Sequence, residues 1–212
     1  MLGLPARASD RYAALVGTVA EPWAGRLGDE LRLLGKPGDF PKGPEIACRF
    51  VRVKPFLDGK LDDACWKDAD KIEIDGGTAR MVCDDQFLYV GVECKGAATG
   101  EKLLRDADLT GRDRVELMLD LDRDYTTGYR IAVDSAGSVA DDCWGDRTWN
   151  PKLFASTART GDGWAAELAI PLSELTGAKP SPGQPWAAGV ARRKAGEAEP
   201  AALGLLRFAA KQ

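Results

Sequence analysis

A period of two runs through the chain from about residue 47 onward, and this pattern constrains the fold more than any other feature. Stretches of five to eight residues, rich in β-branched and aromatic side chains, alternate apolar with polar positions, as β-strands do. Turn residues such as Asp58-Gly59 and Pro182-Gly183 separate these stretches. Nine strands are therefore predicted, at residues 49–53, 79–83, 87–94, 115–121, 129–133, 154–160, 164–170, 186–191 and 203–208.

Helices are scarce in the same region. The sequence favours helical turns only near residues 62–68 and 172–175. Short strands that do not alternate regularly with helices form antiparallel sheets, because a parallel sheet needs crossover helices. We therefore expect an all-β fold over residues 47–212, an antiparallel sandwich or barrel of about nine or ten strands.

A helical appendage and a linker are expected at residues 1–46. Asp10 caps a first segment, and Pro22 opens a second segment whose apolar residues share one face. Gly35 ends the second segment, and the stretch 36–44 is rich in proline and glycine. So short a helix pair cannot bury its own apolar face. We expect it to pack on the following domain or to be the end of a helical repeat region.

The composition excludes several classes of protein. No histidine occurs among the 212 residues, which removes Ser-His-Asp and Cys-His nucleophilic sites and histidine metal ligands. A net charge of −4 gives no broad attraction to nucleic acid. No window has the roughly 18 apolar residues of a membrane span, and the apolar stretch 13–20 makes no convincing signal peptide. The five cysteines lack CxxC spacing, so we expect small buried side chains and no zinc cluster.

An acidic stretch lies between Asp106 and Asp146, where eleven acidic residues and four arginines give a local net charge of −7. Clustered carboxylates suit a hard cation such as Ca²⁺. The part that begins at Asp120 is not an EF-hand loop, because Tyr125 and Ile131 stand where that loop needs glycine and glutamate. The alternative interpretation is that these carboxylates are solvated at strand ends and in a loop.

The tryptophans divide into two groups. Trp66, Trp164 and Trp186 lie in helical or apolar contexts and are predicted to be in the core. Trp144 and Trp149 lie in the polar stretch 141–151. They either stack on a ligand face such as a sugar ring or fold back as a lid over one end of the sandwich.

Several longer motifs follow one another along residues 55–208. The segment 55–66 contains the pattern DGxxDxxxW, and the segment 163–171 reads GWxxExxIP. Between them, 84–90 reads DxxxLYV and 113–117 reads DxVE followed by an apolar residue, and 203–208 closes the series. Together these motifs resemble the signature of family 9 carbohydrate-binding modules.

The resemblance implies an antiparallel β-sandwich that binds sugars without catalysis, so the chain is not expected to be an enzyme. It implies no required cofactor, although members of the family often hold Ca²⁺ in a structural role. It also implies a glycan as ligand and an extracellular or cell-envelope location in a bacterial protein with further domains. Nothing in the residues themselves names the sugar or the location.

For the binding site, the resemblance implies that Glu116 and Arg130 hydrogen-bond sugar hydroxyls. We further expect Arg192 to supply another donor. A cross-strand ion pair between Glu116 and Arg130 is the competing interpretation. The family's two clamping tryptophans have no counterpart, since 108–111 and 197–200 hold no aromatic residue. Trp144 and Trp149 would then replace them. The alternative function is a structural or protein-interaction module that has lost the sugar site.

Overall fold

The computed structural model describes residues 11, 13–15, 18–19, 45–96, 98, 100–123, 128–177, 179–198 and 202–209. The helical appendage and linker expected at 1–46 lie almost wholly outside these residues and stay a prediction. The first strand already begins at Glu45, two residues before the expected domain boundary. No helix within the described residues is long and apolar enough to cross a membrane.

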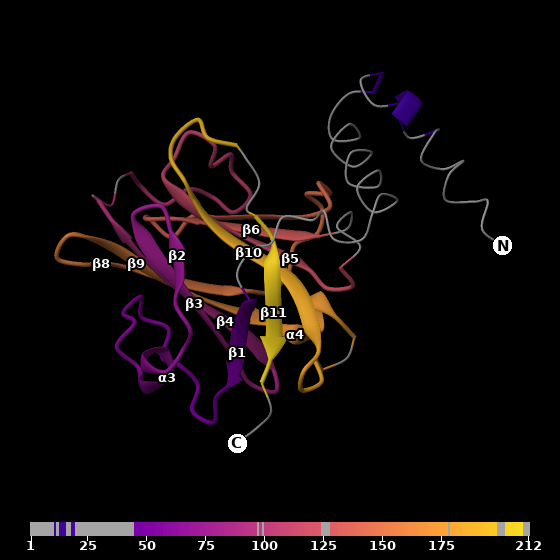
Figure 1. Ribbon diagram of the computed structural model, residues 1–212. Helices are drawn as coiled ribbons and strands as arrows, with labels where there is room; N and C mark the ends of the chain where they lie inside the picture. The colour runs from indigo at the N-terminus through magenta and orange to yellow at the C-terminus, as the bar shows by residue number, and fades with distance from the viewer. Residues whose placement is uncertain are drawn as a thin grey trace.

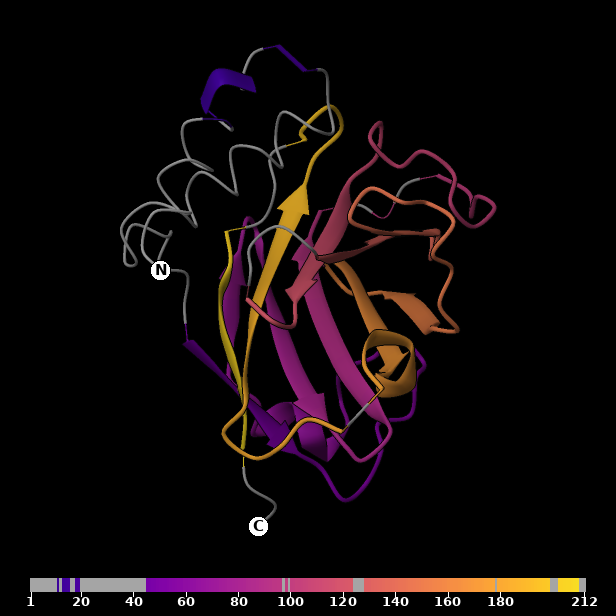
Figure 2. The same ribbon diagram turned by 90° about the vertical axis from the view of Figure 1, so that its right-hand side faces the viewer.

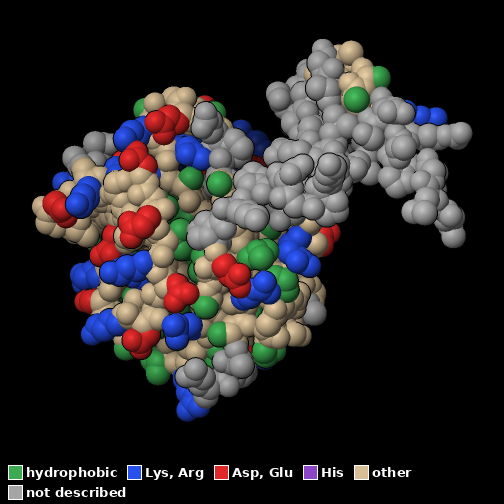
Figure 3. All heavy atoms as spheres, in the orientation of Figure 1, with side chains coloured by type: hydrophobic (Ala, Val, Ile, Leu, Met, Phe, Trp, Pro, Cys, Tyr) green, Lys and Arg blue, Asp and Glu red, His purple; other side chains and the backbone are tan. Residues whose placement is uncertain are grey.

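The elements of the described chain are mostly strands (Figure 1), and basic and acidic side chains are mixed over the face seen from the same direction (Figure 3). Eight of the nine predicted strands are confirmed with small shifts of their ends, and the strand expected at 49–53 lies four residues earlier. Two strands were missed, β2 because it has three residues and β7 because its adjacent aspartates look like a loop. The strands are β1 Glu45–Phe50, β2 Ile72–Ile74, β3 Gly77–Cys83, β4 Phe87–Lys95, β5 Arg114–Asp120, β6 Tyr129–Asp134, β7 Val139–Cys143, β8 Phe154–Arg159, β9 Gly163–Pro171, β10 Pro185–Arg193 and β11 Gly204–Phe208. The two predicted helical turns are present as α3 Ala64–Lys67 and α4 Leu172–Leu175.

The strands form one mixed sheet in the order β7-β6-β5-β10-β11-β1-β3-β4-β9-β8, with β2 paired to β3. Strand β1 joins the two halves, because its first residues pair in parallel with β11 and its last residues pair in parallel with β3. The two edge strands approach each other, since Val139 of β7 and Phe154 of β8 line the same groove. The expected all-β fold is confirmed, whereas the expected purely antiparallel sandwich is not, because the sheet is mixed and barrel-like.

The main core lies between the two halves of the sheet. It unites Leu117 and Ile131 from one half with Val90 and Leu168 from the other, because alternate residues of each strand face inward. The long strands run lengthwise in Figure 2, where α4 is seen end-on as a gold coil. The three tryptophans predicted to be in the core are buried. Of the five cysteines, three are buried and two are half-buried, and none of them forms a disulfide.

A second cluster on the outer face of β4 and β9 explains two of the sequence motifs. The carboxylate of Glu167 is fully buried and accepts hydrogen bonds from the backbone N–H groups of Asp58 and Gly59 at 3.0 and 2.8 Å. It also accepts one from the indole N–H of Trp66 at 2.8 Å. Gly59 has φ +83°, and a Cβ there would lie 2.4 Å from the carbonyl carbon of Thr157, so only glycine fits. The glutamate of the second motif thus holds the aspartate-glycine turn and the tryptophan of the first.

Candidate functional site

The candidate site includes strand β5, whose side chains alternate between the core and the outer face of the sheet. Val115 and Leu117 face the core, so Arg114 and Glu116 face outward. On the neighbouring strand β6, Ala132 lies directly opposite Glu116, and Arg130 lies one step further along the same face. Glu116 and Arg130 are therefore diagonal neighbours on one face of the sheet, as the motif comparison requires.

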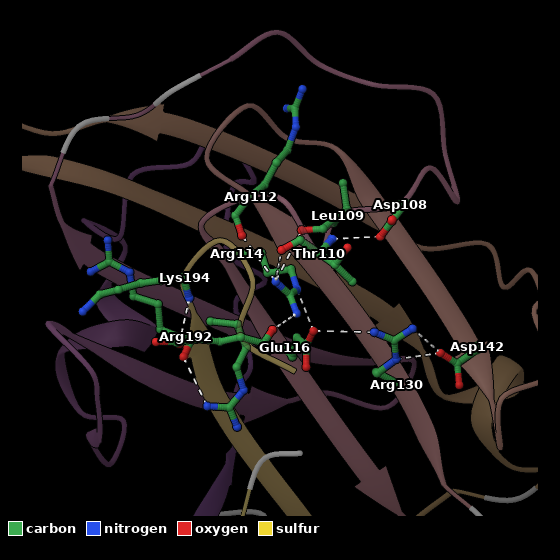
Figure 4. Close-up of polar contacts among 12 residues, drawn as sticks. Asp108, Leu109, Thr110, Arg112, Arg114, Glu116, Arg130, Asp142, Arg192 and Lys194 are labelled. Atoms are coloured by element: carbon green, nitrogen blue, oxygen red, sulfur yellow. Dashed lines mark hydrogen bonds and ion pairs between the residues drawn. The ribbon is translucent and has the colours of Figure 1, made fainter. Parts of the chain in front are cut away.

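The side chains of this face form a chain of ion pairs (Figure 4). The Oε1 atom of Glu116 accepts a hydrogen bond from Nε of Arg114 at 2.7 Å and lies 3.5 Å from Nη1 of Arg130. Nε and Nη2 of Arg130 both contact Oδ2 of Asp142 on β7 at 2.6 Å. Arg130 is thus held between two carboxylates, and the cross-strand ion-pair interpretation describes this geometry.

Arg114 connects the site to the two loops beside it. Its side chain is 2% exposed, and Nη2 donates to the carbonyl of Glu197 at 2.8 Å. Nη1 contacts three further carbonyls at 3.3–3.4 Å, those of Leu109, Thr110 and Arg112. Because one buried guanidinium binds both loops, it fixes their positions relative to Glu116. The sequence motif marks this position only as variable, so sequence reasoning missed it.

The face keeps polar groups that can reach a ligand. The side chain of Arg130 is 36% exposed, and its contacts to Asp142 and Glu116 use three of its five N–H groups. Both contacts of Glu116 involve Oε1, which leaves Oε2 out of them. A carboxylate oxygen beside guanidinium N–H groups can accept from one hydroxyl and donate to the next.

Trp144 is close in sequence to this group. It follows Asp142 by two residues, in the tight turn where the N–H of Asp146 donates to the carbonyl of Cys143 at 2.8 Å. Trp144 is 40% exposed, and its φ of +55° is uncommon for a bulky residue. Strained backbone of this kind concentrates at functional sites, because the surrounding structure must hold it in place.

Trp149 does not join Trp144 on an exposed surface. Its ring packs against the main core and lies 4.7 Å from the ring of Tyr129, with 47° between the ring planes. Tyr129 lies on the core-facing side of β6, in alternation with Ile131. Trp149 therefore has the position of the lid alternative, and the structure does not bring it to Glu116 and Arg130.

Arg192 lies on the opposite face of the sheet from Glu116. On β10 it is opposite Val115 and two residues from Val190, and both of these residues face the core. Its guanidinium binds both carboxylate oxygens of Asp113, with 2.7 Å between Nε and Oδ1. These hydrogen bonds raise the pKa of Arg192 above its ordinary value. The expectation that Arg192 adds a donor to the site is corrected, because its side chain is 7% exposed and already paired.

The acidic stretch divides into exposed carboxylates and carboxylates that are paired with arginine. Five of its carboxylates are paired with arginine and shielded from solvent, in the pairs Asp113–Arg192, Glu116–Arg114, Asp134–Arg112, Asp141–Arg105 and Asp142–Arg130. Burial raises the pKa of Asp141 although Arg105 binds it. No group of three or more acidic or cysteine side chains in the described part of the chain is arranged to hold a metal ion. These five carboxylates do not fit a Ca²⁺ site, and structural Ca²⁺ stays an untested prediction.

Comparison with known proteins finds two enzymes with partial similarity, and no family model matches the sequence. The chain is 31% identical over 138 residues to an endo-1,4-beta-xylanase C of Paenibacillus barcinonensis. It is 28% identical over 138 residues to an endo-1,4-beta-xylanase A of Thermoanaerobacterium saccharolyticum. These regions cover 57% and 58% of this chain but only 12% and 11% of the xylanases, so the similarity concerns a small part of each enzyme.

Solved structures give a longer match. A family 9 carbohydrate-binding module of Caldicellulosiruptor kristjanssonii in complex with cellotriose superposes with a TM-score of 0.61 at 18% identity, over 80% of this chain and 95% of that one. The same kind of module from that organism in complex with glucose gives a TM-score of 0.58 at 20% identity, over 80% and 97%. The described domain therefore has the fold of a family 9 carbohydrate-binding module.

Proposed function

We propose that this domain, which is like a family 9 carbohydrate-binding module in fold, binds a glycan without altering it chemically. The observation that carries the proposal is the pairing of Glu116 with the partly exposed Arg130 on the outer face of β5 and β6. Solved modules of the same fold hold cellotriose and glucose, which supports this class of ligand. Glu116, Arg130 and Trp144 are the proposed contact residues.

Each proposed residue contributes a different kind of contact. The Glu116 carboxylate accepts a hydrogen bond from one sugar hydroxyl, and the Arg130 guanidinium donates to a neighbouring one. Hydrogen bonds to charged groups are worth roughly 1.5–3 kcal/mol each. The exposed indole of Trp144 offers an apolar face to the C–H face of a sugar ring. One aromatic platform and one charged pair together suit weak, specific recognition of a polar ligand.

The proposal includes no hydrolytic activity. A glycosidase needs two carboxyl groups that flank the scissile bond, and one of them must carry and release a proton. On this face, Glu116 and Asp142 are each bound to an arginine, which serves orientation rather than proton transfer. We place the domain beside other domains of a larger bacterial protein, outside the cell or at the cell envelope, with xylanases as the type of neighbour suggested by similarity.

The test is a titration of the protein with cello- and xylo-oligosaccharides, after a glycan array has selected the best ligand. Arg130→Ala should weaken binding roughly tenfold to a hundredfold, equivalent to about 1.5–3 kcal/mol. Arg159→Ala is the matched control, because Arg159 is an exposed arginine on β8, away from this face. If the two variants bind the glycan with equal affinity, Glu116 and Arg130 do not form the binding site. If the unaltered protein binds no glycan at all, the protein-interaction alternative replaces this proposal.

A further inference from the structure

Arg193 lies at the end of β10, beside the candidate site. In the register between β10 and β5, Arg193 is directly opposite Arg114, and Ala191 is directly opposite Glu116. Residues directly opposite each other in a sheet point to the same side, and so do residues two apart on one strand. Arg193 therefore belongs to the same outer face as Arg114 and Glu116, unlike its neighbour Arg192.

The other arginines of this face are matched by carboxylates, and Arg193 is not. Arg112 pairs with Asp134, Arg114 with Glu116, and Arg130 with Asp142. Within the described part of the chain, no carboxylate forms an ion pair with Arg193. Its Nε is buried without an acceptor, and Nη1 has one long contact of 3.4 Å, to the carbonyl of Arg192.

Among the described residues, this arrangement leaves the half-buried guanidinium of Arg193 without a carboxylate partner. A buried guanidinium N–H that has lost water without gaining an acceptor is unfavourable, and an anion bound to the same guanidinium offsets part of that penalty. The nearby charged groups in the described part of the chain do not supply such an anion. Arg114 is a like charge across the strand pair, Lys194 pairs with Asp75, and Glu197 accepts from the backbone N–H of Lys194 at 3.0 Å.

We propose that Arg193 binds the carboxylate of an acidic glycan, so that the preferred ligand of this face contains uronic acid residues. The proposal rests on the proposed function and specifies its ligand class. A planar guanidinium matches a carboxylate better than a sugar hydroxyl, because two parallel N–H groups can bind its two oxygens. The neutral part of the ligand would lie over Glu116, one strand away from Arg193, and over Arg130, two strands away.

The experiment compares a glucuronic-acid-substituted xylo-oligosaccharide with the unsubstituted one by calorimetric titration. The unaltered protein should prefer the acidic ligand. Arg193→Gln should weaken binding of the acidic ligand by roughly tenfold and change binding of the neutral ligand less than about twofold. Arg159→Gln is the matched control, since it removes the same charge from an exposed position on β8. Higher salt should reduce the ratio of the affinities for the acidic and the neutral ligand in the unaltered protein. In Arg193→Gln this ratio should not change with salt.

Equal affinity for the two ligands would overturn the inference, and so would equal effects of Arg193→Gln and Arg159→Gln. If dextran sulfate competes as well as the uronic acid ligand, the preferred anionic group is a sulfate ester and not a carboxylate. That result would overturn the inference as stated. Arg130→Ala, measured with the neutral ligand, reports on the proposed function alone. If neutral binding depends on Arg130 while the acidic preference is absent, only the inference about Arg193 fails.

Discussion

Replacing Glu167 by glutamine should destabilise the domain strongly, although the shape of the side chain hardly changes. Glu167 is fully buried on β9 and accepts three hydrogen bonds, from the backbone of Asp58 and Gly59 and from the indole of Trp66. These donors lie about a hundred residues away along the chain, as the separations of 101 to 109 residues show. The carboxylate therefore attaches an entire loop and α3 to the sheet.

The magnitude follows from the count of donors and acceptors. All three partners are N–H donors, and only a carboxylate offers acceptors on both of its oxygens. Glutamine has one acceptor oxygen, so its amide group must face either the indole N–H or the two backbone N–H groups. At least one buried donor then loses its acceptor, at about 1–3 kcal/mol, and the remaining hydrogen bonds lose the charge that strengthens them. We expect a loss of about 2–4 kcal/mol in the free energy of unfolding, or roughly 4–16 °C in Tm.

Urea denaturation followed by tryptophan fluorescence measures this loss, and a double-mutant cycle with Trp66→Phe assigns it. Phenylalanine removes the indole N–H, so the glutamine of Glu167→Gln no longer leaves that donor unpaired. The loss caused by Glu167→Gln should then be smaller in the Trp66→Phe background, with a coupling of about 1 kcal/mol or more. A change below about 0.5 kcal/mol for Glu167→Gln alone, or strict additivity in the cycle, would refute the reasoning.

Three further predictions concern the aromatic loop, the domain boundary and the thiols. Trp149→Ala should lower the free energy of unfolding by about 2–4 kcal/mol, because the ring of Trp149 packs on the core. Trp144→Ala should leave the Tm within a few degrees and weaken glycan binding. Thermal melts and titrations measure these two effects. A chain that begins at Glu45 should unfold cooperatively, since β1 pairs with β11 from Glu45 onward and with β3 from Arg49 onward. A molten spectrum would contradict this. Thiol reagents at pH 8 should modify Cys65 and Cys94 slowly until the protein unfolds, because burial raises their pKa values to about 11 and about 12; rapid labelling of the native protein argues against it.

The sequence predicted nine of the eleven strands, but it did not predict which strands pair with each other. Alternation reveals that a strand such as β5 has one buried face, but the same alternation occurs whether its neighbours run parallel or antiparallel. The parallel pairing of β1 with both of its neighbours was therefore not visible. Strand β7 was missed because Asp141 and Asp142 stand side by side. They point to opposite sides of the strand, where Arg105 and Arg130 bind them.

The candidate site could be predicted where it depends only on the alternation of residues between the two faces of a strand. Glu116 and Arg130 came from a motif and share a face, as expected. Arg192 could have been excluded by the same rule, because Val190, two residues before it on β10, is apolar and faces the core. The positions of Arg114 and Trp149 depend on contacts with distant loops and strands, about which the period of two carries no information.

The proposed binding face and the hydrogen bonds of Glu167 lie on different halves of the sheet, so their experiments can be interpreted separately. Glu116 and Arg130 belong to β5 and β6, whereas Glu167 belongs to β9, and the two networks share no hydrogen-bond partner among the described residues. Substitutions at sites without shared partners have nearly additive effects on free energy. Glu167→Gln should therefore lower stability and leave the affinity of the folded protein unchanged. Arg130→Ala should weaken binding and also lower stability, because it leaves the shielded carboxylate of Asp142 without its arginine. Weaker glycan binding by folded Glu167→Gln would reveal coupling through the core between the two halves.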